Sequence, residues 1–232
     1  IYGRAAGNPL LIEELCKLLC VRGALRFERG HWHVPLLAEL DLPATKEEAA
    51  ASRLAELTVD QQALLQRAAL LGLVFDPRLL AVAPAEVESV HRELAAIQEA
   101  QLLGPVPESD GALLQFSHEL IRQAALLAPA RPRLQSLYRQ LAEALAENLS
   151  AEEQQEWADW LGRAFSAAGR PAQAGDYFSR AGDLASRLCA VPEAVAAYRQ
   201  AASALANSGE VDRAEALRRR ARALLAERPG TD

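Results

Sequence analysis

The stretch Ala174-Gly175-Asp176-Tyr177-Phe178-Ser179-Arg180-Ala181 holds a pattern that recurs along the chain and decides the fold. The pattern Ala174-x3-Phe178-x2-Ala181 returns as Ala194-x3-Tyr198-x2-Ala201 and, in degraded form, as Ala214-x3-Arg218-x2-Ala221, at intervals of 20 residues. Small residues seven positions apart, with an aromatic residue between them, let two antiparallel helices approach closely and lock around one ring. The pattern therefore predicts packed helices in the C-terminal part of the chain.

Upstream residues complete one unit of this pattern. Leu161-Gly162-x2-Phe165 and Gly169 precede Ala174, and the unit they open ends at Ala181. The unit resembles a tetratricopeptide repeat, although the later intervals are shorter than the usual length of about 34 residues. Such repeats stack because none buries its hydrophobic face alone, and the stack presents a concave surface. We expect antiparallel helix-hairpin repeats here.

Composition favours helices throughout. Of the 232 residues 50% are hydrophobic but only 5% are aromatic, and Ala and Leu, both strong helix formers, are abundant. We therefore expect a mainly all-α fold. Residues 1–128 carry 11 Lys and Arg against 17 Asp and Glu, whereas residues 129–232 carry 14 of each. The whole net charge of −6 thus lies in the first part, where no basic face for a nucleic acid is evident.

Three helix starts carry the capping-box pattern, in which a hydroxyl and an acid or amide three residues later satisfy each other's backbone donors. They are Thr45-x2-Glu48, Thr58-x2-Gln61 and Ser150-x2-Glu153, so helices are expected to begin near residues 46, 59 and 151. Further helices are expected at 9–20, 77–82, 84–101, 118–127 and 132–148.

Two short β-hairpins are expected between these helices. The first spans residues 25–34 around a turn at Gly30, and the second pairs residues 102–103 with 112–116 around Asp110-Gly111. Three or four helices followed by a hairpin is the order of a winged-helix domain, which we place at residues 43–128.

Three motifs, in order, resemble those of the signal-transducing ATPases with numerous domains (STAND ATPases). They are Gly7-Asn8-Pro9-Leu10 with Glu13-Glu14-Leu15; Leu42-Pro43, Arg53-Leu54-x2-Leu57 and Leu65-Gln66-x-Ala68-Ala69-x2-Gly72-x2-Phe75; and Phe116-Ser117-His118-Glu119. The first is similar to the Gly-x-Pro motif of the nucleotide-binding module, and the others to the winged-helix segment. The resemblance is closest to bacterial members that carry tetratricopeptide repeats downstream.

This resemblance implies a nucleotide-gated switch with ADP or ATP and Mg²⁺ as its cofactors. Pro9 would pack against the adenine, and His118 would reach the β-phosphate of ADP and hold the resting state. However, the 232 residues contain no G-x-x-x-x-G-K-[ST] phosphate loop, and we expect no aspartate that ends an apolar strand and holds Mg²⁺. We therefore expect no catalytic residue and no bound cofactor in this chain, and we expect the nucleotide-binding core upstream of Ile1.

Simpler interpretations exist for each candidate residue. Pro9 suits the first position of any helix, and His118 would sit in a first helical turn capped by Ser117. His31-x-His33 has no further ligands nearby in the sequence, so no metal site is expected. Cys16 and Cys20 share a helix face, where we expect them to pack as small apolar side chains. Trp157 and Trp160 are expected to pack between helices.

Other partners are excluded on charge and length. The helix expected at 84–101 would enter a DNA groove, yet it carries Glu86, Glu88, Glu93 and Glu99 against Arg92 alone. The run at Arg218–Arg222 is expected to be a solvated face. No apolar run is long enough to span a membrane. Three cysteines without a signal peptide indicate a cytoplasmic location.

These observations give one interpretation and one alternative. The chain would comprise the end of a nucleotide-binding or lid module (1–42), a winged-helix latch (43–128) and a linker helix with tetratricopeptide-like repeats (129–232). The repeats would bind an effector protein or another protomer, and the latch would contact the upstream nucleotide-binding domain in cis. The alternative is a stand-alone helical adaptor without any nucleotide role.

Overall fold

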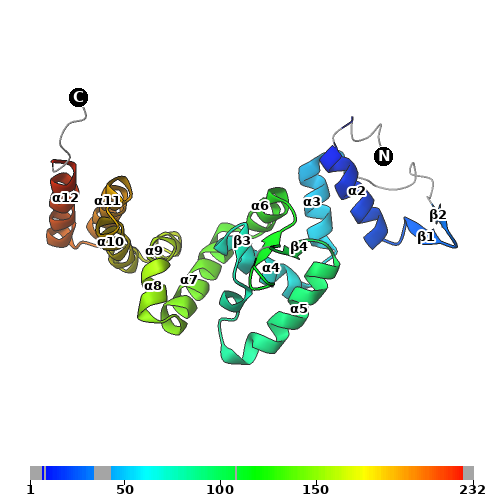
Figure 1. The fold of residues 1–232 in the computed structure, drawn as a ribbon, viewed down its shortest axis with the longest axis horizontal. Coiled ribbons are helices and arrows are strands. Elements are labelled where there is room, and N and C mark those ends of the chain that lie inside the picture. The colour runs from blue at the N-terminus through cyan, green and yellow to red at the C-terminus, as the bar shows by residue number, and fades with distance from the viewer. Residues whose placement is uncertain (1–6, 8, 34–42, 108, 227–232) are drawn as a thin grey trace. The chain divides into compact units, whose positions relative to one another are not determined.

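The structure is a computed structural model that describes residues 7, 9–33, 43–107 and 109–226. Helices account for 71% of it and strands for 7%, so the all-α class is confirmed. The chain divides into two compact units, Ile1–Ala130 and Arg131–Asp232, which are described separately below (Figure 1). Leu42 lies outside the described residues, as do residues 1–6, 8 and 34–41.

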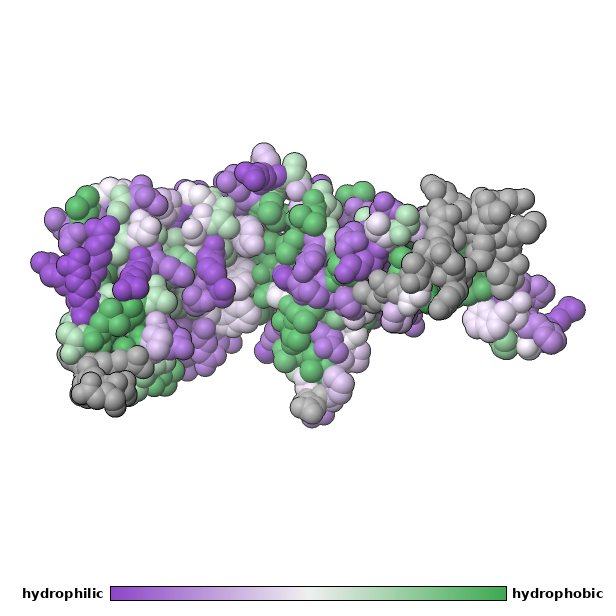
Figure 2. Space-filling view, turned by 90° about the horizontal axis from the view of Figure 1, so that it is seen from above, coloured by the Kyte–Doolittle hydropathy of each residue, from purple (hydrophilic) through white to green (hydrophobic). Residues whose placement is uncertain are grey.

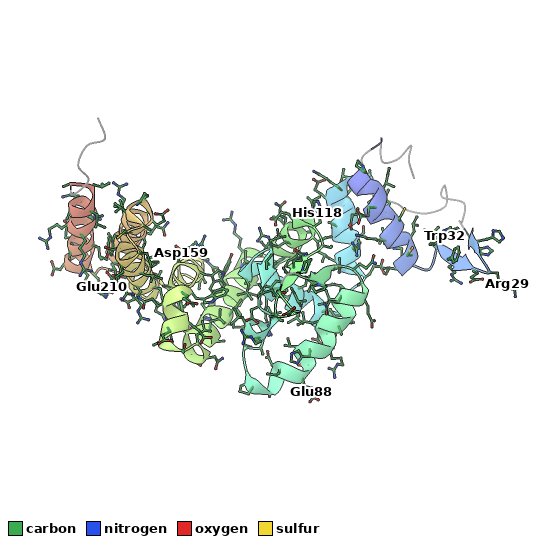
Figure 3. All side chains as sticks on the ribbon, viewed as in Figure 1. Arg29, Trp32, Glu88, His118, Asp159 and Glu210 are labelled. Atoms are coloured by element: carbon green, nitrogen blue, oxygen red, sulfur yellow. The ribbon has the colours of Figure 1, made fainter. Side chains whose placement is uncertain are left out.

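The first unit begins with helix α2 (Pro9–Val21) and a small hairpin. Four leucines on one side of α2 are buried, namely Leu11, Leu15, Leu18 and Leu19, and α2 packs on the next helix. The hairpin consists of β1 (Arg26–Glu28) and β2 (His31–His33), antiparallel as predicted, and all six of its residues are exposed. Phe27 and Trp32 pair across it with ring centroids 5.1 Å apart. Trp32 is labelled at the right of Figure 3.

Helices α3 (Lys46–Ala55) and α4 (Val59–Leu71) begin where the capping pattern places them. Thr58 and Gln61 form the complete reciprocal box at the start of α4. Thr45 likewise accepts the Glu48 N–H, but the Glu48 carboxylate accepts from Ala44 N–H, one residue before the cap. The local hydrogen-bonding pattern therefore fixes both helix starts.

Two expected helices differ in the structure. Residues 77–82 form only a 3₁₀ turn, η2 (Pro77–Leu80), which Asp76 caps by accepting the Arg78 N–H. The helix expected at 84–101 begins with a 3₁₀ turn, η3 (Pro84–Glu86), and continues as α5 (Val87–Glu99). Proline opens both turns, and Ala83 has no side chain to cap an α-helical first turn.

The second hairpin belongs to a three-stranded antiparallel sheet, because β3 (Val74–Phe75) was missed in the sequence. Strands β4 (Leu103–Pro105) and β5 (Leu114–Phe116) form the hairpin, and the strand order is β3-β5-β4. A two-residue strand carries no detectable alternation, and its pairing with β5 spans about 40 residues of sequence. The hairpin forms the projection at the lower centre of Figure 2, where green hydrophobic side chains are visible. Helix α6 (Glu119–Leu127) closes this unit and packs on α3 and α4.

The second unit contains six helices in its described residues: α7 (Arg131–Asn148), α8 (Ala151–Glu156), α9 (Ala158–Ala167), α10 (Pro171–Arg187), α11 (Val191–Asn207) and α12 (Val211–Ala226). Ser150 and Glu153 form a complete capping box at α8. The 20-residue period of the sequence thus corresponds to one helix and one turn, not to a pair of helices.

The turns repeat with the same period. Gly169, Cys189 and Gly209 all adopt the left-handed conformation, with φ of 72°, 58° and 88°. The residue after each donates its N–H to a carbonyl five residues back, closing the helix end in the same way three times. Of these three turns, only the second has a residue with a Cβ, Cys189, in the left-handed conformation. Glycine adopts this conformation at lower energetic cost.

Rings pack on glycines between consecutive helices. A Cβ at Gly162 of α9 would lie 2.6 Å from the Phe178 ring of α10, and one at Gly182 of α10 would lie 2.6 Å from the Tyr198 ring of α11. Gly175 of α10 meets Leu205 of α11 in the same close way. Because residue 175 faces 205 while 182 faces 198, α10 and α11 run antiparallel.

Helices α10 and α12 run side by side and parallel. Two ion pairs in register join them: Arg213 to Asp176 at 2.5 Å, and Arg220 to Asp183 at 3.1 Å. Both partners advance by seven residues from one pair to the next, so the two helices keep the same direction. Helices α10 and α12 are therefore neighbours although α11 separates them in the sequence. A groove lies between them, and a side chain of α11 forms its floor.

Candidate functional site

His118 is the N-cap of α6, which corrects the expectation that Ser117 caps this helix. The His118 ring accepts the Leu120 N–H at Nδ1, at 3.1 Å, and its backbone is extended, as a cap requires. Ser117 instead donates its N–H to the Leu102 carbonyl, which ends the sheet. Because Nδ1 accepts, the proton of the neutral ring lies on Nε2, which is left as a donor. Figure 3 labels His118 at this end of α6.

The cap opens onto an open groove of about 610 Å³. Glu13 and Lys17 of α2 form one wall, the sheet with Gly104 and Gln115 forms another, and His118 and its neighbours form the third. Three glutamines, Gln98, Gln101 and Gln115, give it amide groups. The groove is therefore polar and joins three elements that are distant in the sequence.

Charges of both signs line this groove. Lys17 lies 2.5 Å from Glu13, and this ammonium, together with the nearby His118, holds the pKa of the Glu13 carboxyl below its usual range. Arg122 lies 2.6 Å from Glu119 and lowers the pKa of that carboxyl in the same way. Both acids are therefore ionised at neutral pH: Glu13 is paired with Lys17, and Glu119 with Arg122.

Pro9 occupies the first position of α2 and is exposed. It does not line the groove, but residues 9, 13 and 17 follow each other at four-residue spacing and so share one face of the helix. The structure therefore places Pro9 on the same stripe of α2 as two groove residues, about 6 Å along the axis from Glu13.

A buried ion pair that sequence reasoning missed fixes α2 against the rest of this unit. Arg53 of α3 donates to Glu14 at 2.6 Å and, through its other nitrogen, to the Ala100 carbonyl at the end of α5. Both charged residues are only 3% exposed. The sequence feature that could have predicted this pair is a charged residue within an apolar helix pattern. Glu14 and Arg53 are both such residues, and each belongs to one of the three motifs quoted above.

A second hollow, of about 420 Å³, lies between α3, α4 and α6. Its lining is largely apolar, with Ala51 and Leu54 from α3, Leu65 from α4 and Leu120 and Ala124 from α6 among its residues. Gln66 of α4 also lines it, and the buried side-chain oxygen of Gln66 has no hydrogen-bond partner in the described structure. No motif in the sequence predicted this hollow.

In the second unit, Tyr198 lies in the groove between α10 and α12, about 550 Å³ in volume. Its hydroxyl donates to Asp183 at 2.7 Å, and burial together with this carboxylate raises the pKa of Tyr198 to about 12. A matching groove of about 460 Å³ contains Phe178 between α9 and α11.

The remaining sequence candidates are dispersed. His31 and His33 lie on the exposed strand β2, and the described ranges contain no group of three His, Cys, Asp or Glu residues that could hold a metal. Cys16 is half-buried and Cys20 is exposed. Trp157 and Trp160 meet edge to face, with centroids 5.9 Å apart.

Charged helix faces complete the picture. Glu88 and Glu99 of α5 are exposed. Within the basic run, Arg218 pairs with Glu215 at 2.6 Å, and Figure 2 shows purple hydrophilic side chains over much of α12, at the left of the view.

Where the chain is described, no helix combines the length and the apolar character needed to cross a bilayer. No protein-family model, curated protein or solved structure matches the chain.

Proposed function

We propose that this chain is the regulatory and protein-interaction part of a nucleotide-gated signalling switch of the STAND type. In this proposal residues 43–128 are a winged helix that latches the ADP-bound resting state, with Pro9 against the adenine and His118 against the β-phosphate. The phosphate loop and the Mg²⁺ ligands lie in an upstream domain of the same cytoplasmic protein, and the chain itself catalyses no reaction.

The observation that carries this proposal is the stripe of α2 that begins at Pro9 and continues through Glu13 and Lys17 into the groove at His118. One helix face thus joins the residue proposed for the adenine to the wall beside the residue proposed for the phosphate. Lys17 and the Nε2–H of His118 are hydrogen-bond donors of the kind that a phosphate needs.

The buried pair of Glu14 and Arg53 supports the same arrangement. Removing one member of such a pair leaves an uncompensated charge, so α2 is held firmly against α3 and the end of α5. A latch needs this rigidity, because a nucleotide that touches α2 and α6 together biases the unit only if these helices keep a fixed relation.

The stacked helices of the second unit are proposed to bind an effector protein or another protomer. Two grooves support this proposal: one contains Phe178 between α9 and α11, and the other contains Tyr198 between α10 and α12. Each has an aromatic ring at its floor and at least one charged residue at its edge. Such ridged faces are the surfaces through which helical repeats bind other proteins.

One observation favours the alternative, a helical adaptor without a nucleotide role. Glu13 and Glu119 lie close enough to His118 to interact with it electrostatically, and both carboxylates would repel a phosphate. Under this alternative, His118 serves only as the cap of α6.

Labelled ADP bound to the full-length protein distinguishes the two functions. We expect His118→Ala to weaken ADP binding about 10- to 150-fold, the effect of losing one hydrogen bond to a charged group. His118→Asn is the decisive variant, because asparagine keeps the cap but removes the imidazole. His91→Ala, on the exposed face of α5, is the control and should retain ADP.

If His118→Asn binds ADP as tightly as the natural protein, the histidine acts only as a cap and the proposed latch contact is wrong. If the natural full-length protein binds no ADP, the adaptor interpretation holds. The 232-residue chain alone should hydrolyse no ATP and should bind it no better than millimolar, because it lacks the phosphate cradle. Micromolar ATP binding by this chain would contradict the proposal.

A further inference from the structure

The hollow between α3, α4 and α6 is separate from the groove at His118 and has no part in the proposed function. Its volume of about 420 Å³ lies within the range of small-molecule sites. Helices α3, α4 and α6 line it, with the buried Leu54 and Leu65 and the small residues Ala51 and Ala124 in its walls. Small residues at these positions create the opening.

Hydrogen bonding singles out one residue of the lining. Gln62 donates from its side chain to the carbonyls of Leu54 and Leu57, at 3.1 and 3.0 Å, and Gln123 donates to Glu119 at 3.2 Å. Gln66 is 6% exposed, and its side-chain oxygen is buried without a donor anywhere in the described residues. Gln66 lines the hollow, so the one buried side-chain acceptor that the described residues leave unmet belongs to its wall, where other atoms cover it.

An unmet acceptor is a defined chemical requirement. Buried carbonyl oxygens in folded proteins almost always have a donor, and leaving one without a donor destabilises the fold. Leucine at position 66 would fill the same space without this cost. Because the Gln66 oxygen is covered, a ligand reaches it only when the amide turns toward the hollow. The terminal torsion of glutamine is soft, so this turn costs little.

We propose that this hollow is a binding site for a small, mostly apolar molecule with a single hydrogen-bond donor, which bonds to Gln66. The walls supply apolar contact, and Gln66 supplies the only polar requirement that the lining leaves unmet. Glu47 is the one charged residue of the lining and is exposed, so the site favours a neutral ligand.

Two matched probes test the chemistry of the site in the full 232-residue chain. 2-Naphthol carries one hydroxyl donor, and 2-methoxynaphthalene has almost the same shape without it. Fluorescence titration should give saturable binding of one equivalent of each probe. 2-Naphthol should bind about tenfold tighter, the factor that one hydrogen bond of ordinary strength provides.

Three variants locate the binding. Gln66→Leu should abolish the tenfold preference and leave 2-methoxynaphthalene binding unchanged, and its melting temperature should not fall, because it removes an unmet acceptor. Ala124→Phe should fill the hollow and weaken both probes at least tenfold. Gln173→Leu, an equal change on the exposed side of α10, should change neither affinity.

Three results would overturn the proposal: no saturable binding, equal affinity for both probes, or a preference for 2-naphthol that survives Gln66→Leu. If Ala124→Phe binds both probes as the natural chain does, they bind elsewhere and the assignment to this hollow is wrong. Circular dichroism of each variant confirms that the helices are intact, so loss of fold is not mistaken for loss of the site.

Discussion

We call the contact between two consecutive helices of the second unit a step. The steps from α9 to α10 and from α10 to α11 differ from the step from α11 to α12 at two equivalent positions. The first two steps place a ring 16 residues after a glycine, as Gly162 with Phe178 and Gly182 with Tyr198. At the third step the equivalent residues are Ala202 and Arg218, so the ring is absent and the glycine has become alanine. Within one chain, therefore, glycine occurs where a ring packs on it and alanine where none does.

This difference shows that ring and glycine form a matched pair. A methyl group at either glycine would lie 2.6 Å from ring carbons, well inside contact distance, whereas Ala202 has its methyl group and is 1% exposed. Alanine is the better helix former by about 1 kcal/mol, so glycine remains only where close approach requires it. Arg218 instead pairs with Glu215 on the surface of α12, so no ring is present at this step.

Phe178→Ala should produce the largest effect, because it removes the ring and leaves the Gly162 side of the contact empty. We expect a loss of about 3–5 kcal/mol in the free energy of unfolding, measured by urea denaturation. Arg218→Ala, at the equivalent position of α12, should cost less than about 1 kcal/mol. Equal losses for the two variants would contradict the distinction between the steps.

Gly182→Ala should cost about 1–3 kcal/mol, because its methyl group would meet the Tyr198 ring. The sign is informative, since glycine to alanine in an exposed helix stabilises by about 1 kcal/mol. The reciprocal change, Ala202→Gly, should cost about 1–2 kcal/mol, through backbone entropy and the loss of a buried methyl group. Stabilisation by Gly182→Ala would mean that the ring moves aside freely and that no matched pair exists.

Cys189→Gly should stabilise the chain by about 1 kcal/mol, because it makes the second turn like those at Gly169 and Gly209. Cys189 is exposed, so little packing is lost. Cys189→Ala is the matched control: it removes the thiol but keeps a Cβ in the left-handed conformation, and should change stability by a few tenths of a kcal/mol. Thermal melts of the two variants provide the comparison.

The contribution of Tyr198 to stability should depend on pH at high pH, whereas that of Phe178 should not. Its pKa is raised to about 12 by burial and by Asp183, so the folded state favours the neutral phenol more than the unfolded state does, where the value is about 10. The resulting stability is complete below about pH 10 and is lost as the pH rises from there toward 12. Urea midpoints of the natural chain should fall over this range.

Tyr198→Phe should lack this component of the alkaline decline, whereas Phe178 cannot titrate and contributes nothing to it. The same decline in Tyr198→Phe and the natural chain would assign the effect to other groups.

Several elements could be predicted because their determinants are local. The capping boxes at Thr58 and Ser150 and the Asp110-Gly111 turn depend on residues a few positions apart. The winged-helix and STAND assignments rest on motifs and stay predictions. The sequence also placed His118 in a distinctive motif, but the choice between Ser117 and His118 as the cap depended on the sheet, which engages the Ser117 backbone.

By itself, then, the sequence determined the all-α class, the starts of several helices in the first unit and the 20-residue period, because each follows from propensity, capping and spacing along a single segment. Only the tertiary structure decided which partners meet across long separations. Glu14 meets Arg53 39 residues away, Asp176 meets Arg213 37 residues away, and Gln66 is left without a donor beside an apolar hollow. These contacts depend on how helices cross and on which atoms remain after packing, and no local pattern records either.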